Sequence, residues 1–183
     1  MKKMMTAIVR FTHYRKTKRQ RNEHERLANP GRLALFRTRP SADNNSQAEK
    51  KRKRDLPAGH GETILIVDDE SNIREVTAAV LSRTGYNTLV AEDGPAALAI
   101  FVERWAEIDV VVTDLVMPAV SGSLLVQVLR KMASKVRIII CSGQAVDHMP
   151  VQLRAMGVQG YLSKPYTEET LLRMVDRVLH DLF

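Results

Sequence analysis

The 183-residue sequence has a single cysteine, Cys141, and its five histidines are scattered without metal-ligand spacing. One thiol cannot form an intrachain disulfide, and a structural zinc site needs several Cys or His ligands. No apolar run approaches the roughly 20 residues of a membrane-spanning helix, and the stretch between Lys3 and Arg10 is too short for a standard secretory signal. The sequence therefore predicts neither a membrane protein nor a secreted one, and it favours a reducing cytoplasm.

Charge is divided unevenly along the chain, whose formal net charge is +7. Residues 1–60 hold 17 Lys+Arg and 5 Asp+Glu, a balance of +12, whereas residues 61–183 hold 11 and 16, a balance of −5. The basic part has no sustained hydrophobic period, so it cannot bury enough surface to offset its chain entropy. We expect residues 1–60 to form a basic, largely disordered N-terminal extension and linker, and residues 61–183 to form one domain.

From Gly61 onward, short apolar runs alternate with segments of helical period. Strands are predicted at residues 63–67, 87–91, 110–113, 136–141 and 160–162. Helices are predicted at residues 71–84, 95–104, 121–132, about 150–156 and 167–182. Ser71 is a suitable N-cap, Gly85 a suitable helix terminator and Pro95 a suitable first-turn residue. The expected buried face of the first helix carries Ile73, Val76, Thr77 and Val80.

Apolar runs without alternation, such as residues 64–67 and 110–112, indicate strands that are buried on both faces. Right-handed crossovers then give a parallel sheet covered by helices. The strands at 87–91 and 160–162 are the least apolar, which suits sheet edges. The sequence therefore predicts an α/β, doubly wound fold whose five-stranded parallel sheet has the flavodoxin-like order 2-1-3-4-5.

Polar residues follow four of the predicted strands. Asp68 and Asp69 follow the first strand, Asp114 the third, Ser142 the fourth and Lys164, after one serine, the fifth. Ligands of such sheets bind beyond the carboxyl ends of the strands, so the three aspartates should line one crevice with Ser142 and Lys164 on its flank. Clustered carboxylates repel unless a cation lies among them, and oxygen ligands select a hard ion such as Mg²⁺. The lysine charge and the serine hydroxyl suit a phosphoryl group on one carboxylate.

These motifs give residues 61–183 a close resemblance to response-regulator receiver domains. The matching pieces are Val67-Asp68-Asp69-Glu70, the acceptor segment at 114–122, the hydroxyl of Ser142 and the Lys164-Pro165 pair, all in the expected order. Residues 56–63 are similar to the linker that leads into receivers at the C-terminus of hybrid sensor kinases. The resemblance is therefore closest to receivers of that kind.

The resemblance implies a role for each matching residue. Asp114 would be the phospho-acceptor, while Ser142 and Lys164 would each bond a phosphoryl oxygen. Asp69 would bind Mg²⁺ directly and Asp68 mainly through water. The carboxylate of Asp114 and the main-chain carbonyl of Val116 would complete the metal site.

Other residues have both a functional and a structural interpretation. By the resemblance, Tyr161 would turn inward when Ser142 moves, but it could instead simply pack on the last helix. Lys164 could be a solvated loop residue, and its bond to Pro165 is often cis in the family. Cys141 is expected to be a buried small hydrophobe.

The resemblance also implies partners. Phosphate would come from a histidine kinase or a histidine phosphotransfer protein, and the only chemistry would be the domain's own phosphorylation and dephosphorylation, so the protein would not be an enzyme in the usual sense. Because the sequence ends at Phe183, directly after the last predicted helix, output is expected by protein contact or through the extension.

Two alternatives remain. The basic extension could grip nucleic-acid phosphates under control of the receiver, or residues 1–55 could be a remnant or a wrongly assigned start. A dehalogenase-like phosphatase is disfavoured, because Asp114 is followed by Leu115 and Val116 instead of a second acid two residues on.

Overall fold

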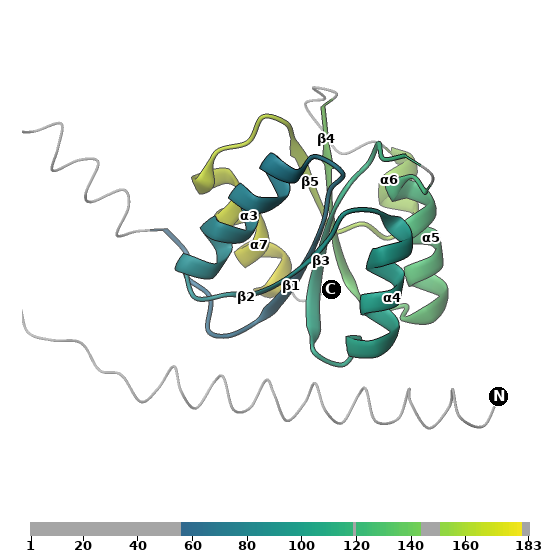
Figure 1. The fold of residues 1–183 in the computed structure, drawn as a ribbon, viewed down its shortest axis with the longest axis horizontal. Helices are drawn as coiled ribbons and strands as arrows, with labels where there is room; N and C mark the ends of the chain where they lie inside the picture. Colours follow the sequence, from purple (N-terminus) through teal and green to yellow (C-terminus); the bar gives the residue numbers. More distant parts are fainter. Residues whose placement is uncertain (1–55, 119, 144–150, 181–183) are drawn as a thin grey trace, which may run out of the picture. The chain divides into compact units, whose positions relative to one another are not determined.

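The computed structural model describes residues 56–118, 120–143 and 151–180. These residues form strands and helices in strict alternation (Figure 1). In chain order the elements are β1 (Thr63–Val67), α3 (Ser71–Arg83), β2 (Asn87–Ala91), α4 (Gly94–Arg104), β3 (Ile108–Asp114), α5 (Gly122–Met132), β4 (Arg137–Ser142), α6 (Val151–Ala155), β5 (Gly160–Ser163) and α7 (Glu168–His180). Residues 1–55, for which the sequence predicts disorder, lie outside the described residues.

The five strands pair in parallel in the order β2-β1-β3-β4-β5. The predicted sheet order is therefore confirmed, and the two least apolar strands, β2 and β5, are its edges. β3 starts two residues earlier than predicted and includes Asp114 as its last residue, and β4 ends on Ser142. All strands run in the same direction, so their carboxyl ends lie on the same side of the sheet. Asp68, Asp114, Ser142 and Lys164 are therefore brought together at that side.

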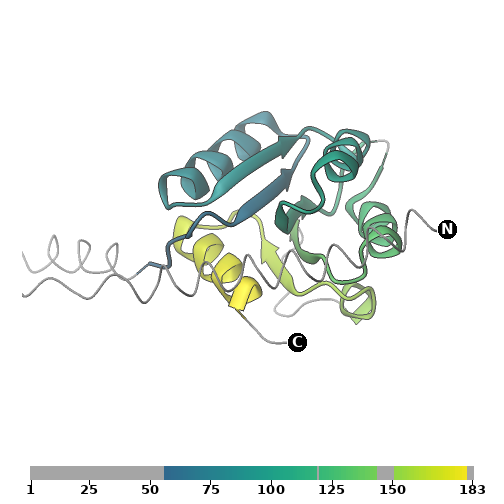
Figure 2. The same ribbon diagram turned by 90° about the horizontal axis from the view of Figure 1, so that it is seen from below.

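The sheet is covered by helices on both faces, with α3 and α7 on one side and α4, α5 and α6 on the other (Figures 1 and 2). Ile64 and Ile66 of β1 pack with Leu81 of α3 and Val175 of α7 in one core cluster, the α3–α7 cluster. Leu65 and Val67 pack in the other, the α4–α5–α6 cluster, which includes Phe101 of α4, Leu125 of α5 and Leu153 of α6. All four β1 side chains are at most 2% exposed. Burial on both faces explains why the strand shows no polar alternation.

Two predictions for the first helix are wrong. Ser71 is the first helical residue, and the N-cap is Glu70, whose side chain makes no capping hydrogen bond. Val76 is 64% exposed, because the buried face of α3 is carried by Thr77 and Leu81. Adjacent residues of a helix point about 100° apart, so Val76 turns away from the face that its neighbour occupies. In contrast, Pro95 lies in the first turn of α4, as expected, with Asp93 as the N-cap.

The segment before β1 is packed on the domain. Leu56 contacts the α3–α7 cluster, and the main-chain N–H groups of Gly59 and Gly61 donate to the carbonyls of Thr84 and Gly85 at 2.7 and 3.0 Å. Gly85, the predicted terminator, has a φ of +94°, and a Cβ there would lie 2.5 Å from the Gly59 carbonyl oxygen. The boundary at Gly61 stays a prediction, but Leu56 and Gly59, which precede it, already pack on the domain. Within the described part of the chain, no helix has the length and apolar character required to cross a bilayer.

Candidate functional site

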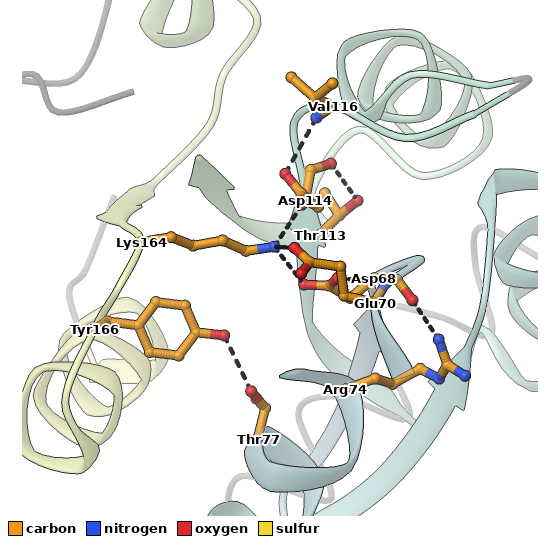
Figure 3. A network of polar contacts seen from close by, with 9 residues as sticks. All are labelled: Asp68, Glu70, Arg74, Thr77, Thr113, Asp114, Val116, Lys164 and Tyr166. Atoms are coloured by element: carbon orange, nitrogen blue, oxygen red, sulfur yellow. Dashed lines mark hydrogen bonds and ion pairs between the residues drawn. The ribbon is translucent and has the colours of Figure 1, made fainter. Parts of the chain in front are cut away.

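Four predicted site residues lie together at the carboxyl ends of β1, β3, β4 and β5 (Figure 3 shows three of them). Asp68 follows β1, Asp114 ends β3, Ser142 ends β4 and Lys164 follows β5. Asp68 is 3% exposed, Asp114 6% and Ser142 1%. The side chain of Lys164 is 11% exposed, so it is not a solvated loop residue. The strand order therefore produces the juxtaposition that the sequence predicts.

Lys164 holds the acidic residues together. Its Nζ lies 2.5 Å from Oδ2 of Asp114, 2.8 Å from Oδ2 of Asp68 and 3.5 Å from Oε1 of Glu70. Burial alone would lower the pKa of Lys164, but its hydrogen bonds and ion pairs with Asp114 and Asp68 outweigh burial and raise the pKa. The ammonium therefore stays cationic at neutral pH and supplies a fixed positive charge to the site.

Both buried aspartates are oriented in the same way. The second oxygen of each carboxylate accepts from the main-chain N–H two residues further on. Glu70 N lies 3.0 Å from Oδ1 of Asp68, and Val116 N lies 3.1 Å from Oδ1 of Asp114. Arg74 of α3 also donates to the Asp68 carbonyl at 2.6 Å, which ties the helix to the end of β1. Each carboxylate is thus held by one main-chain N–H group and by the shared lysine.

The donor set fits a divalent metal ion such as Mg²⁺. Asp68, Glu70 and Asp114 each offer a carboxylate oxygen, and these oxygens lie within 4.8 Å of one another. Burial raises the pKa of Asp68, although hydrogen bonds from Lys164 and the Glu70 N–H act against the rise. Three ionised carboxylates and one ammonium carry a formal charge of −2, which a divalent hard cation would offset. The residues present therefore fit the ion that the sequence predicts.

The cluster differs from the predicted ligand set at one position. Asp69 is exposed and is not one of the three converging carboxylates, whereas Glu70, 61% exposed at its side chain, is one of them. Glu70 belongs to the acidic run Asp68-Asp69-Glu70, but no feature of the sequence marks it as a ligand. The direct metal contact of Asp69 and the carbonyl contact of Val116 stay predictions.

The predicted switch residues lie in the neighbouring strands. The Ser142 carbonyl accepts from Lys164 N at 2.7 Å. Tyr161 of β5 is half-buried and packs against the α4–α5–α6 cluster, on the face of the sheet opposite α7, so it does not pack on the last helix. The structure places both residues but does not test the predicted movement. The Lys164–Pro165 bond is cis.

Cys141 is a buried small residue, as predicted. It is 2% exposed, and burial raises the pKa of its thiol to about 12. The thiol is therefore neutral at physiological pH, which suits a packing role and not a nucleophilic one.

Sequence reasoning missed the special position of Gly122. This residue begins α5, and its N–H donates to the Leu115 carbonyl at 3.0 Å. A Cβ at residue 122 would lie 1.9 Å from the Asp114 carbonyl oxygen. The start of α5 therefore rests on the main chain of the candidate acceptor, and only glycine allows this approach.

Comparisons with known proteins agree with this geometry. The family model for the response regulator receiver domain matches residues 64–176. The sensor kinase CckA of Brucella abortus is 34% identical over 131 residues, which are 72% of this chain and 14% of that protein. The phosphate regulon transcriptional regulatory protein PhoB of Pseudomonas aeruginosa is 33% identical over 121 residues, 65% of this chain and 52% of that protein.

Solved structures with this fold include two receivers with more than 30% identity. The Vibrio cholerae chemotaxis protein CheY4 superposes with a TM-score of 0.60 at 31% identity, covering 65% of this chain and 99% of that one. The receiver domain of the hybrid histidine kinase CckA superposes with a TM-score of 0.55 at 32% identity, covering 64% and 99%. The chain thus matches whole receiver domains but spans only about half, or less, of the two full-length relatives.

Proposed function

The chain belongs to the response regulator receiver family, whose domains are phosphorylated on an aspartate by histidine kinases or phosphotransfer proteins, and on that premise we propose that Asp114 is the phospho-acceptor. The observation that carries this assignment is the position of Asp114 at the end of the central strand β3. One of its oxygens faces Lys164 and the other faces the Val116 N–H. Asp68, the other buried aspartate, follows β1, and its Oδ2 lies 2.8 Å from the same lysine Nζ.

In the proposed reaction, a carboxylate oxygen of Asp114 attacks the phosphorus of a phosphohistidine donor. The O–P bond forms as the N–P bond breaks, and the electron pair of that bond stays on the imidazole, which takes up a proton. Lys164 pairs with one phosphoryl oxygen and the Ser142 hydroxyl donates to another. Bound Mg²⁺ would supply the positive charge that offsets repulsion between the carboxylates and the incoming phosphoryl group. The chain's own task is to orient Asp114 and to keep Lys164 beside it.

The metal ligands in this proposal are the carboxylates of Asp68, Asp69 and Asp114 and the carbonyl of Val116. Receiver domains bind Mg²⁺ through acidic residues, and the convergence of the Asp68 and Asp114 carboxylates supports these two ligands. Glu70 converges on the same place and is a further candidate. Ser142 and Tyr161 would report phosphorylation, and partners would read it by contact with α6, β5 and α7.

Labelling with a small phosphodonor tests the function directly. We expect the full chain, incubated with acetyl phosphate and Mg²⁺, to gain one phosphoryl group as an acyl phosphate, which hydroxylamine removes. Chelation of Mg²⁺ with EDTA should prevent labelling, because the carboxylates then repel the donor. Intact-mass spectrometry before and after hydroxylamine measures both effects. Absence of label, or a label that resists hydroxylamine, would contradict the proposal.

A matched pair of variants decides which exposed carboxylate binds the metal. Mg²⁺ should raise the melting temperature of the parent by several degrees, since a ligand present at 100 times its Kd stabilises the native state by about 2.7 kcal/mol. Asp69→Ala should lose this response together with phosphorylation, whereas Glu70→Ala should keep most of both. Thermal melts with and without Mg²⁺ are the measurement. The reverse result, with Glu70→Ala unresponsive and Asp69→Ala unchanged, would assign the contact to Glu70.

A second function is supported by charge alone. Residues 1–60 carry a balance of +12, and such a segment attracts nucleic-acid phosphates without sequence preference. We propose as the alternative that this extension binds nucleic acid under control of the receiver.

Truncation separates the two functions. A chain that starts at Leu56 keeps the contacts of residues 56–61 and carries a net charge of −5. It should unfold cooperatively and accept phosphate at the parent rate, while any nucleic-acid binding disappears. Binding by the full chain should fall steeply as salt rises, which a fluorescence-anisotropy titration measures. Loss of folding or of phosphorylation on truncation would make the extension part of the receiver.

A further inference from the structure

A partly buried hydrogen bond lies next to the site and has no part in the proposed chemistry. The hydroxyl of Tyr166, two residues after Lys164, lies 3.0 Å from Oγ1 of Thr77 in the middle of α3 (Figure 3). Thr77 is 2% exposed, and the Tyr166 ring packs against the α3–α7 cluster. Hydroxyl groups in such surroundings cost free energy unless they are paired. The two side chains therefore satisfy each other in an otherwise apolar layer.

This bond joins the two segments that carry opposite charges in the site. On one side, α3 follows directly after Asp68 and Glu70, and Arg74 ties it to the Asp68 carbonyl at 2.6 Å. On the other side, Tyr166 continues the loop that presents Lys164. A second link between these segments, Arg83 to Glu168 at 2.5 Å, has side chains that are 59% and 32% exposed, so solvent screens it.

The lysine side chain needs such an anchor. It has four rotatable bonds, so the place of its ammonium depends on how firmly its main chain is held. The main-chain N–H of Lys164 donates to the Ser142 carbonyl at 2.7 Å, which fixes the chain at the lysine itself. Two residues after the lysine, the hydroxyl of Tyr166 contacts α3. A tyrosine side chain has only two torsions, so this contact restrains the loop that carries Lys164. Burial raises the pKa of the Tyr166 phenol, so its hydroxyl keeps its proton at neutral pH.

We propose that Tyr166 is a positioning residue of the receiver, which through its hydrogen bond to Thr77 holds the Lys164 ammonium between the carboxylates of Asp68 and Asp114. The inference rests on the proposed function, because it assigns to Lys164 the pairing with the phosphoryl group. It adds a residue outside the four matching motifs to the machinery of that site.

Removal of one hydroxyl tests the role. Tyr166→Phe keeps the ring and loses the bond, and we expect it to slow labelling of the full chain by acetyl phosphate and Mg²⁺ by about threefold to tenfold, the equivalent of one hydrogen bond. Thr77→Val should slow labelling equally, and the double variant should be no slower than either single one. Labelling of Tyr166→Phe at the parent rate would overturn the proposal.

Two comparisons separate positioning from a general loss of stability. Tyr86→Phe removes a hydroxyl from a buried tyrosine of the same cluster, next to Gly85 and away from the site, and should leave the labelling rate within about twofold of the parent. In a Lys164→Met background, Tyr166→Phe should lower the melting temperature as before but should not slow labelling further. Equal slowing by Tyr86→Phe, or full slowing without Lys164, would show that the hydroxyl acts only through stability.

The lysine can also be observed without phosphorylation. In ¹⁵N-labelled protein, the ammonium of Lys164 should exchange its protons slowly while two carboxylates hold it, and Tyr166→Phe should speed this exchange at least about threefold. If the parent is never phosphorylated, the proposed function fails, and this measurement still decides the positioning role. Unchanged exchange in Tyr166→Phe would overturn that role while leaving the phospho-acceptor assignment standing.

Discussion

Asp114→Asn should abolish phosphorylation while the domain stays folded. The substitution removes the nucleophilic carboxylate and keeps the size of the side chain. An amide oxygen can face either the Val116 N–H or the Lys164 ammonium, so one of the two present hydrogen bonds is lost. Loss of a carboxylate also relieves its repulsion with Asp68, and we expect the free energy of unfolding to change by less than about 2 kcal/mol. Mass spectrometry after incubation with acetyl phosphate and Mg²⁺ measures the labelling.

The same strand provides a matched control for this variant. Asp109 lies near the start of β3, whereas the site lies at the other end of this strand. Oδ2 of Asp109 accepts from Thr63 N at 3.0 Å. Asp109→Asn should therefore be labelled at the parent rate. If Asp114→Asn gains as much label as the parent, or if Asp109→Asn also loses it, the acceptor is another residue or the label reports only the integrity of β3.

The sheet was predictable because its signals are local. The apolar run Ile64–Val67 and its counterpart in β3 have the composition of strands buried on both faces, and the two least apolar strands suit the edges of the sheet. The positions of Asp68, Asp114 and Lys164 then followed from a general rule about where parallel strands end. Nothing beyond the strand order was needed to bring these three residues together.

Features that depend on side-chain placement were not predictable. The sequence pattern cannot tell that the carboxylate of Glu70 converges on the cluster while that of Asp69 is exposed. It also cannot show that Thr77 meets a tyrosine 89 residues away, because that contact depends on how α3 and the β5–α7 loop pack. Val76 was misplaced for the same reason, since the buried face of α3 is set by its tertiary neighbours.

Arg130 is another residue whose role only the structure reveals. Its guanidinium, at the end of α5, donates to main-chain carbonyls before β4 and before β5, namely those of Ser134, Val136, Met156 and Gly157. It also donates to Oε1 of Gln159 at 3.0 Å, and that oxygen accepts from Ile138 N at 2.8 Å. The residue thereby fastens the end of α5 to the segments that precede β4 and β5. A basic residue in the last turn of a helix does not by itself predict this role.

Gly122→Ala is expected to have the largest effect on stability among single substitutions near the site. Its Cβ would lie 1.9 Å from the carbonyl oxygen of Asp114, 2.9 Å from the Asp114 carbonyl carbon and 3.0 Å from Cα of Leu115. All three atoms belong to the main chain, so no rotamer change can relieve the overlap. Either α5 or the end of β3 must move, and we expect the free energy of unfolding to fall by about 3 kcal/mol or more. Urea denaturation followed by circular dichroism measures the change.

Other glycines of the described domain calibrate this expectation. At Gly94 an added Cβ would lie 2.6 Å from Cγ1 and 2.7 Å from Cβ of Val120, but no closer than 3.3 Å to a main-chain atom. These overlaps are smaller than the 1.9 Å approach at residue 122, so Gly94→Ala should cost less than Gly122→Ala. At Gly143 an added Cβ meets no atom of the described residues within 4 Å, and Gly143→Ala should change stability by no more than about 0.5 kcal/mol. Because movement of β3 displaces the carboxylate of Asp114 from Lys164, Gly122→Ala should also slow phosphorylation under conditions in which it is still folded. A Gly122→Ala protein as stable and as readily labelled as Gly143→Ala would mean that α5 does not rest on the acceptor's main chain.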